Sequence, residues 1–277
     1  MMQGSEVIAG IYNGKEWKTT RLTDNLSADL APSAASDGTG KGVVVWRNVA
    51  GSDPEEPLNF DVADELWYSS YQGGEEDAWR SPKLIHRETN GNITSLETAM
   101  DSEGNTGIVY SVSRKDSNNS VYDQCNDVFF QFVNKDGEAS DPVRLTIGEG
   151  TNENAKITVV NYNGQERFIT AWYQNRYDEE LGSTLGDVCF RLLDTEGVQD
   201  QNFPDSLGEM NQTVKVAIGN KFEFVESLDR DLSDLAVAWS TTSMAEEGNE
   251  QSQRDLLYVS KFLTKDAAVS MLSLIHI

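Results

Sequence analysis

The chain is poor in cysteine, histidine, proline and positive charge. Its 277 residues include two cysteines, two histidines and six prolines. Two cysteines form neither a disulfide framework nor a four-cysteine zinc site, so disulfide-rich and zinc-ribbon domains are excluded. Lysine and arginine number 22 against 46 aspartates and glutamates, a net charge of −24. Because such a surface repels phosphate backbones, we expect no nucleic-acid partner.

Long hydrophobic runs are also missing. No apolar stretch approaches the roughly 20 residues that a membrane-spanning helix requires, so we expect no membrane insertion in this segment. The opening residues, MMQGSEVIAG, have no basic region followed by a long apolar stretch, so no secretory signal is found in this sequence. The apolar fraction of 38% is typical of a folded chain.

Two series of apolar segments recur along the chain. The first series, β-branched runs that end in an aromatic residue, is anchored by Trp46, Tyr110, Trp172 and Trp239. The second, an acidic residue before an apolar run, is anchored by Glu65, Asp127, Asp187 and Asp255. The intervals are 64, 62 and 67 residues in the first series and 62, 60 and 68 in the second. Two independent anchors with one period indicate an internal repeat.

Each repeat parses as four strands separated by turns rich in glycine and aspartate. The run Val43–Trp46 is apolar at every position, which is typical of a strand buried on both faces. Four-stranded units whose second strand is covered on both faces suit the blades of a β-propeller. We therefore predict an all-β fold, a β-propeller fragment of four-stranded blades that is incomplete at both ends.

The predicted domain organisation is a partial β-propeller over residues 1–271. It comprises a half blade at 1–24, blades at 30–87, 92–148 and 153–208, and a partial blade at 212–271. The last six residues, LSLIHI at 272–277, match the in-frame translation of a transposase adapter used in sequencing libraries. We interpret them as an adapter artefact on a truncated metagenomic gene, the alternative being a native hydrophobic tail, and infer nothing from His276.

The pattern APSAASDGTGKGVVVWRN…ELWYSSYQGG…AWRSPKLI resembles the blades of sialidase-like (BNR-type) propellers and of their non-catalytic relatives in large bacterial surface proteins. This resemblance implies an extracellular or cell-surface location. The Asp-box of sialidases, Ser-x-Asp-x-Gly-x-Thr-Trp, is not found, and only an Asp-Gly turn and Trp79 are similar to it. The departure favours a binding module over a hydrolase.

Binding is expected in the long loops between strands two and three, which share one face of a propeller with the connections between blades. Three of these loops carry an aromatic residue followed by aspartate, at Phe60–Asp61, Tyr122–Asp123 and Tyr177–Asp178. An aromatic ring can stack on a sugar while the carboxylate accepts hydrogen bonds from its hydroxyls, which predicts a glycan-binding platform. Alternatively, the rings close the end of the blade core and the aspartates cap turns.

Other charged residues offer weaker signals. Arg114 and Arg176 each lie four residues after a strand-two aromatic and are candidates for pairing with a ligand carboxylate, the alternative being ordinary ion pairs. DSEGN at 101–105 and DRDLSD at 229–234 offer oxygen ligands for calcium, but neither has the distal glutamate of an EF-type loop. No cofactor is therefore assigned. The lone His86 is expected to be a plain surface residue.

We therefore expect an extracellular, non-catalytic binding or adhesion module of a bacterial surface protein, with a glycan or protein as its ligand. The first alternative is a sialidase-like glycoside hydrolase whose catalytic residues lie partly outside this fragment. The second is a spacer that binds nothing. No catalytic residue is assigned.

Overall fold

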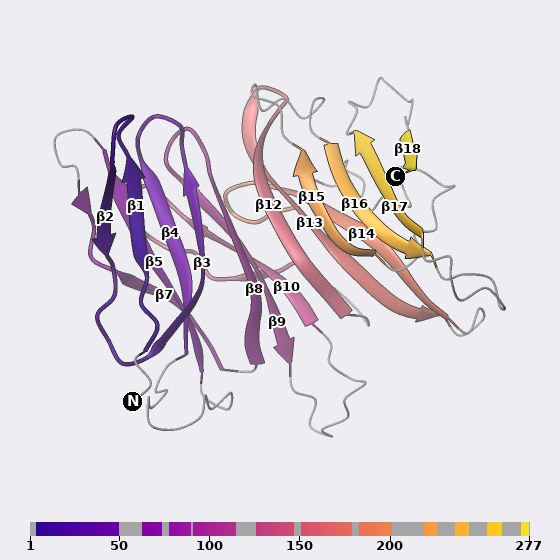
Figure 1. Cartoon of the computed structure of the whole chain (residues 1–277), viewed down its shortest axis with the longest axis horizontal. Helices are drawn as coiled ribbons and strands as arrows, with labels where there is room; N and C mark the ends of the chain where they lie inside the picture. The colour runs from indigo at the N-terminus through magenta and orange to yellow at the C-terminus, as the bar shows by residue number, and fades with distance from the viewer. Residues whose placement is uncertain are drawn as a thin grey trace. The chain divides into compact units, whose positions relative to one another are not determined.

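A computed structural model describes residues 4–49, 63–73, 78–89, 91–114, 126–146, 151–178, 183–200, 219–225, 236–243, 254–261 and 273–276. Within these ranges every regular element is a β-strand, and the strands form five antiparallel sheets (Figure 1). The chain divides into two compact units, residues 1–144 and 145–277. The first three sheets belong to the first unit and the last two to the second.

The first unit holds three sheets. The first sheet consists of β1 (Ile8–Tyr12) and β2 (Trp17–Arg21). The second contains β3 (Ala28–Ser36), β4 (Gly42–Val49) and β5 (Asp64–Gln72), with β6 (Ala78–Trp79) and β7 (Lys83–Glu88) both paired to β5. The third contains β8 (Gly91–Met100), β9 (Thr106–Arg114), β10 (Asn126–Val133) and β11 (Val143–Arg144).

The second unit holds two sheets. The fourth sheet contains β12 (Thr151–Tyr162), β13 (Gln165–Asp178) and β14 (Ser183–Leu193). The fifth contains β15 (Gly219–Val225), β16 (Ala236–Ser243), β17 (Arg254–Lys261) and β18 (Ser273–His276). Strands that follow one another in the sequence are neighbours in each sheet, except that β6 and β7 both pair with β5. The prediction of an all-β fold built from repeated, four-stranded antiparallel blades is confirmed, while the blade boundaries stay a prediction.

The second sheet is buried on both faces, as the apolar run in β4 predicts. Val43 and Val45 pack into one core cluster with residues of the third sheet, including Tyr110. Val44 and Trp46 pack into another with residues of the first sheet. Full burial of each large apolar side chain contributes about 1.5–3 kcal/mol, so sheet-on-sheet packing is the main stabilising term in this unit.

The turns between the first two strands of successive blades are built alike. Asp101 Oδ1 accepts the backbone N–H groups of Glu103 and Asn105, at 3.0 and 2.8 Å. Asp37 Oδ1 accepts those of Thr39 and Lys41 in the same way. Burial of Asp37 acts to raise its pKa, but the hydrogen bond from the Thr39 hydroxyl, together with these backbone hydrogen bonds, outweighs that effect and lowers the pKa. Residues 101–105 therefore form a turn in which the aspartate bonds its own backbone.

Candidate functional site

Of the eight predicted binding residues, four lie outside the described part of the chain: Phe60, Asp61, Tyr122 and Asp123. The backbone of the other four is described. Arg114 is the last residue of β9, and Arg176, Tyr177 and Asp178 are the last three of β13. Tyr177 and Asp178 pair with Thr184 and Ser183 of β14, so these two are strand residues and not loop residues.

A cleft of about 420 Å³ lies where β3 begins, β4 ends and β5 begins. It is lined by Leu22, Thr23, Asp24, Asn25, Ser27, Asp29, Trp46, Asn48, Glu65, Trp67 and Pro82, and we call it the polar cleft. The connection at 22–27 supplies five of these residues. The cleft therefore opens at the end of the second sheet where the sequence predicts binding.

One row of side chains across the second sheet forms the base of the polar cleft. Asp29 in β3 is opposite Asn48 in β4, which is in turn opposite Glu65 in β5. Residues in one cross-strand row project from the same face of a sheet. All three side chains are buried, so a carboxylate, an amide and a second carboxylate lie side by side below the opening.

The two carboxylates of this row are held by hydrogen bonds. Asp29 Oδ1 accepts the indole N–H of Trp46 at 3.0 Å and the side-chain N–H of Asn48 at 2.7 Å. Glu65 Oε2 accepts the indole N–H of Trp67 at 2.9 Å, and Glu65 Oε1 pairs with Arg87 of β7. Buried carboxylates are tolerated when they are bonded in this way. The indole of Trp67 is only partly buried, so it remains accessible at the wall of the cleft.

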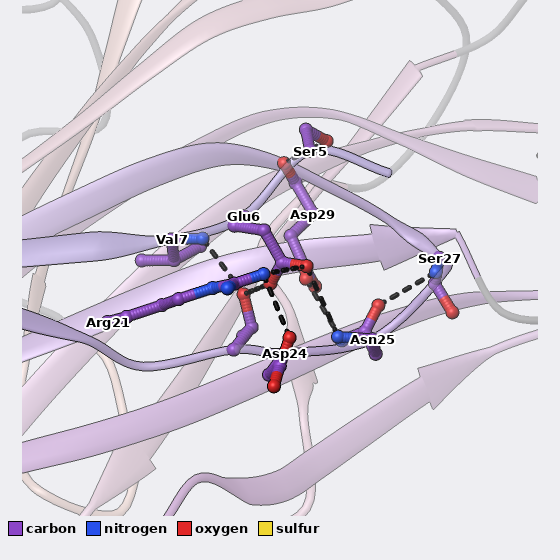
Figure 2. A network of polar contacts seen from close by, with 9 residues as sticks. Ser5, Glu6, Val7, Arg21, Asp24, Asn25, Ser27 and Asp29 are labelled. Atoms are coloured by element: carbon purple, nitrogen blue, oxygen red, sulfur yellow. Dashed lines mark hydrogen bonds and ion pairs between the residues drawn. The ribbon is translucent and has the colours of Figure 1, made fainter. Parts of the chain in front are cut away.

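The wall formed by residues 22–27 is fixed by a polar network that Figure 2 shows. Arg21 bridges Glu6 and Asp24, with both nitrogen–oxygen distances at 2.9 Å. The Thr23 hydroxyl donates to Glu6 Oε2 at 2.6 Å and accepts the Val7 backbone N–H at 2.9 Å. Burial of Glu6 acts to raise its pKa, but the hydrogen bond from Thr23 and the adjacent guanidinium outweigh this and lower it. Glu6 is therefore an ionised anchor for the connection.

The same network continues into the cleft. Asn25 donates a side-chain N–H to Asp29 Oδ2 at 3.1 Å, and its side-chain oxygen accepts the Ser27 backbone N–H at 2.7 Å. The Ser5 hydroxyl donates to the Asp29 backbone carbonyl at 2.7 Å. Asp29 thus joins the base of the cleft to its wall, and Figure 2 shows its contact with Asn25 of the wall. The geometry of the opening is set by the folded scaffold before any ligand arrives.

In the second and third sheets, the acid that precedes strand three has a structural partner that the sequence analysis missed. Glu65 pairs with Arg87 of β7, and Asp127 pairs with Arg144 of β11 at 2.6 Å. Both carboxylates are buried, and each is paired with an arginine of the neighbouring strand. An arginine in the strand that follows strand three, Arg87 in one sheet and Arg144 in the other, is the signal that would have identified these pairs.

A second, larger hollow in the first unit has different chemistry. Its volume is about 750 Å³, and five successive residues of β1 line it together with β3 and β4. Aromatic pairs gather there, Tyr12 with Trp17 at 5.5 Å and Tyr71 with Trp79 at 5.4 Å between ring centroids. None of the described residues that line it has a carboxylate or amide side chain. We call it the apolar groove.

Two classes of site are not seen in the described part of the chain. Within the described ranges, no three histidine, cysteine, aspartate or glutamate side chains gather where they could hold a metal ion. The acidic segment 229–234 lies outside the described residues. No helix among the described residues is long and apolar enough to cross a membrane.

No protein-family model matches the sequence, and no curated protein matches it either. Among solved structures, the chain is similar to the parainfluenza virus 5 hemagglutinin-neuraminidase with the ligand DANA, at 9% identity and a TM-score of 0.48. That match covers 90% of this chain and 61% of the viral chain, so this chain spans less than two thirds of it.

Two further solved structures are similar to this chain at low identity. The endo-arabinase from Bacteroides thetaiotaomicron is 13% identical, with a TM-score of 0.42 over 90% of this chain and 83% of that one. A glycoside hydrolase is 11% identical, with a TM-score of 0.44 over 92% of this chain and 76% of that one.

Proposed function

We propose that this chain is an extracellular, non-catalytic binding module of a bacterial surface protein, and that it holds a glycan in the polar cleft. One observation carries the proposal: a partly buried indole, Trp67, lies beside buried and fully oriented hydrogen-bonding groups of Asp29, Asn48 and Glu65. Sites for small polar ligands combine an apolar wall with a few fixed polar groups in this way.

The chemistry of the cleft matches that of a sugar ring. The face of a pyranose presents C–H groups that pack on an aromatic ring, while its edge presents hydroxyl groups. Trp67 offers the ring, and the carboxylates of Asp29 and Glu65 offer acceptors at the base. Because these acceptors are already held by Trp46, Asn48 and Arg87, little side-chain entropy is lost when a ligand binds.

We propose that the long connection between β4 and β5 adds to this site. It leaves the sheet at Val49 and returns at Asp64, next to Asn48 and Glu65 of the cleft. In our proposal the aromatic–aspartate pairs Phe60–Asp61, Tyr122–Asp123 and Tyr177–Asp178, together with Arg114 and Arg176, add ligand contacts, each on its own blade.

A glycan microarray followed by calorimetric titration tests the proposal, with two matched tryptophan variants. Trp67 and Trp79 both belong to the second sheet and pack against the same core cluster, but Trp67 lines the polar cleft and Trp79 the apolar groove. Trp67→Ala should weaken glycan binding at least about fivefold, because truncating an aromatic anchor commonly costs more than about 1 kcal/mol. Trp79→Ala should bind as the parent does. Equal affinities of the two variants, or an array without any bound glycan, would contradict the proposal.

The non-catalytic part of the proposal has its own test. Incubation with a 4-methylumbelliferyl conjugate of sialic acid should release no fluorescence above the buffer rate. Release by the intact chain that Glu65→Gln abolishes would show a hydrolase instead.

A further inference from the structure

We propose that the polar cleft selects amino sugars, which carry an ammonium group, over saccharides that carry a carboxylate or sulfate. The inference rests on the proposed function and adds the class of ligand. It follows from three features of the cleft: which hydrogen-bond donors are already used, which acceptors remain, and how charge is distributed around the opening.

The donors of the cleft are largely used within the protein. The indole N–H groups of Trp46 and Trp67 are donated to Asp29 and Glu65. The Thr23 hydroxyl proton is donated to Glu6. A primary amide carries two N–H groups, so Asn25 and Asn48, which each give one to Asp29, keep one each, and the Ser27 hydroxyl is a third available donor. An anionic ligand, which only accepts hydrogen bonds, therefore finds few donors.

The acceptors of the cleft are not used up. A carboxylate has about four acceptor positions, two on each oxygen. Among the contacts of the described residues, Asp29 accepts three hydrogen bonds with its carboxylate and Glu65 accepts two. Open positions remain on Asp29 Oδ2 and on both oxygens of Glu65. Charge-assisted bonds from an ammonium to such oxygens are roughly twice as strong as neutral hydrogen bonds.

The charge around the opening is negative. Glu6, Asp24, Asp29 and Glu65 supply four carboxylates, while the guanidinium groups there are those of Arg21 and Arg87. Arg21 is shared between Glu6 and Asp24, and Arg87 is paired with Glu65. Among the described residues, no lysine or arginine lines the cleft itself. An ammonium is attracted to this site and a sugar carboxylate is repelled from it.

Three trisaccharides of similar size separate these cases: the glucosamine trimer, the N-acetylglucosamine trimer and the galacturonic acid trimer. Titration of the whole chain with each should give the tightest binding for the glucosamine trimer, and its advantage should shrink in 0.5 M salt because ionic attraction is screened. The galacturonic acid trimer should bind at least about tenfold more weakly than the glucosamine trimer, a difference of about 1.4 kcal/mol.

Charge-neutralising variants give the second readout. The Asp24 side chain is 86% exposed, so Asp24→Asn changes the charge without disturbing a core. It should lower the preference for the glucosamine trimer over the N-acetylglucosamine trimer about two- to fivefold, which is the range of an exposed ion pair. Glu65→Gln should lower it further. Asp136→Asn, at an exposed turn of the third sheet, is the matched control and should leave the preference unchanged.

The outcomes separate the inference from the proposed function. Equal or tighter binding of the galacturonic acid trimer would overturn the inference, and so would a preference that neither Asp24→Asn nor Glu65→Gln reduces. If none of the three trisaccharides binds while the microarray records another glycan, the inference fails and the proposed function stands. If no glycan binds at all, both fail.

Discussion

The first three strands pair in the same order in the second and third sheets. One row of side chains across these strands is polar in the second sheet and mostly apolar in the third. In the second sheet the row across the first three strands is Asp29, Asn48 and Glu65. In the third sheet the equivalent row is Ile93, Val112 and Asp127. Ile93 and Val112 are buried in a core cluster that also contains residues of β4 and β5, so apolar side chains fill the place that corresponds to the polar cleft.

The connections into the two sheets differ as well. Six residues join β2 to β3 and form a wall of the cleft, whereas two residues join β7 to β8. A short connection leaves no wall, and an apolar pair closes the corner instead. The comparison teaches that the blade register is a repeated scaffold, and that the identity of one cross-strand row decides whether a corner is core or site.

The fourth sheet has a third version of this row. Asn152 is opposite Gln174, and Gln174 is opposite Asp187. In the second sheet Asp29 accepts the indole N–H of Trp46. The indole N–H of the equivalent Trp172 is buried and has no hydrogen-bond partner among the described residues. The carboxylate of Asp29 therefore holds the indole of Trp46, whereas the amide of Asn152 does not hold the indole of Trp172.

The largest effect is expected from placing a carboxylate in the third sheet, at the position equivalent to Asp29. Ile93→Asp would place a carboxylate among the apolar side chains of a core cluster, close to the carboxylate of Asp64, which already accepts the backbone N–H of residue 93 and pairs with Arg47. We expect the free energy of unfolding to fall by about 4 kcal/mol or more, because an unpaired buried charge is among the costliest substitutions. Urea denaturation measures it, with Ile93→Val as the size control at a cost of about 1 kcal/mol. A cost for Ile93→Asp no greater than that of Ile93→Val would contradict the comparison.

The second largest effect is expected from removing the carboxylate of Asp29 in the second sheet. Asp29→Ala would leave the buried N–H groups of Trp46 and Asn48 without their acceptor. We expect a loss of about 3 kcal/mol, since each unsatisfied buried group costs about 1–3 kcal/mol. Asp29→Asn, which keeps one acceptor oxygen, should cost less. The order of the two variants in urea denaturation is the decisive result, and equal costs would show that hydrogen bonding to Asp29 does not hold this corner.

The smallest predicted effect is a pH dependence of stability that comes from His86 in β7 of the second sheet. The expectation of a plain surface histidine is wrong, because its side chain is 19% exposed and its ring lies 5.8 Å from that of Tyr110. Burial lowers the pKa of His86 below its ordinary value of 6.5, although the nearby Glu88 acts to raise it. The folded state then binds fewer protons than the unfolded state, so stability should fall as the pH drops through about 6.5.

His86→Gln provides the check on this titration. The parent should lose stability between pH 7.5 and 5.5 in thermal unfolding, and the variant should lose less over the same window. Below pH 5 the lowered pKa values of Glu6 and Asp37 add a separate loss that both proteins share. Identical profiles above pH 5.5 would show that His86 is solvated in the folded state.

The sequence predicted the scaffold better than the site. The run Val43–Trp46 predicts a strand buried on both faces, because every position is apolar. The spacing of such runs indicates the repeat. The sequence does not predict that Asp29, Asn48 and Glu65 form one row, because the row depends on strand register. A bulge after Leu30 shifts the pairing of β3, with Ala31 in the left-handed region at φ 48°. Alanine rarely adopts that conformation, so its identity does not signal the bulge.

The central claim is that a glycan binds in the polar cleft, and a crystal structure of the chain with a bound saccharide tests it most directly. The account predicts a sugar ring against Trp67, with hydroxyl or ammonium groups bonded to Glu65 and Asp29. A saccharide seated instead in the apolar groove beside Trp79, with the polar cleft occupied only by solvent, would contradict it.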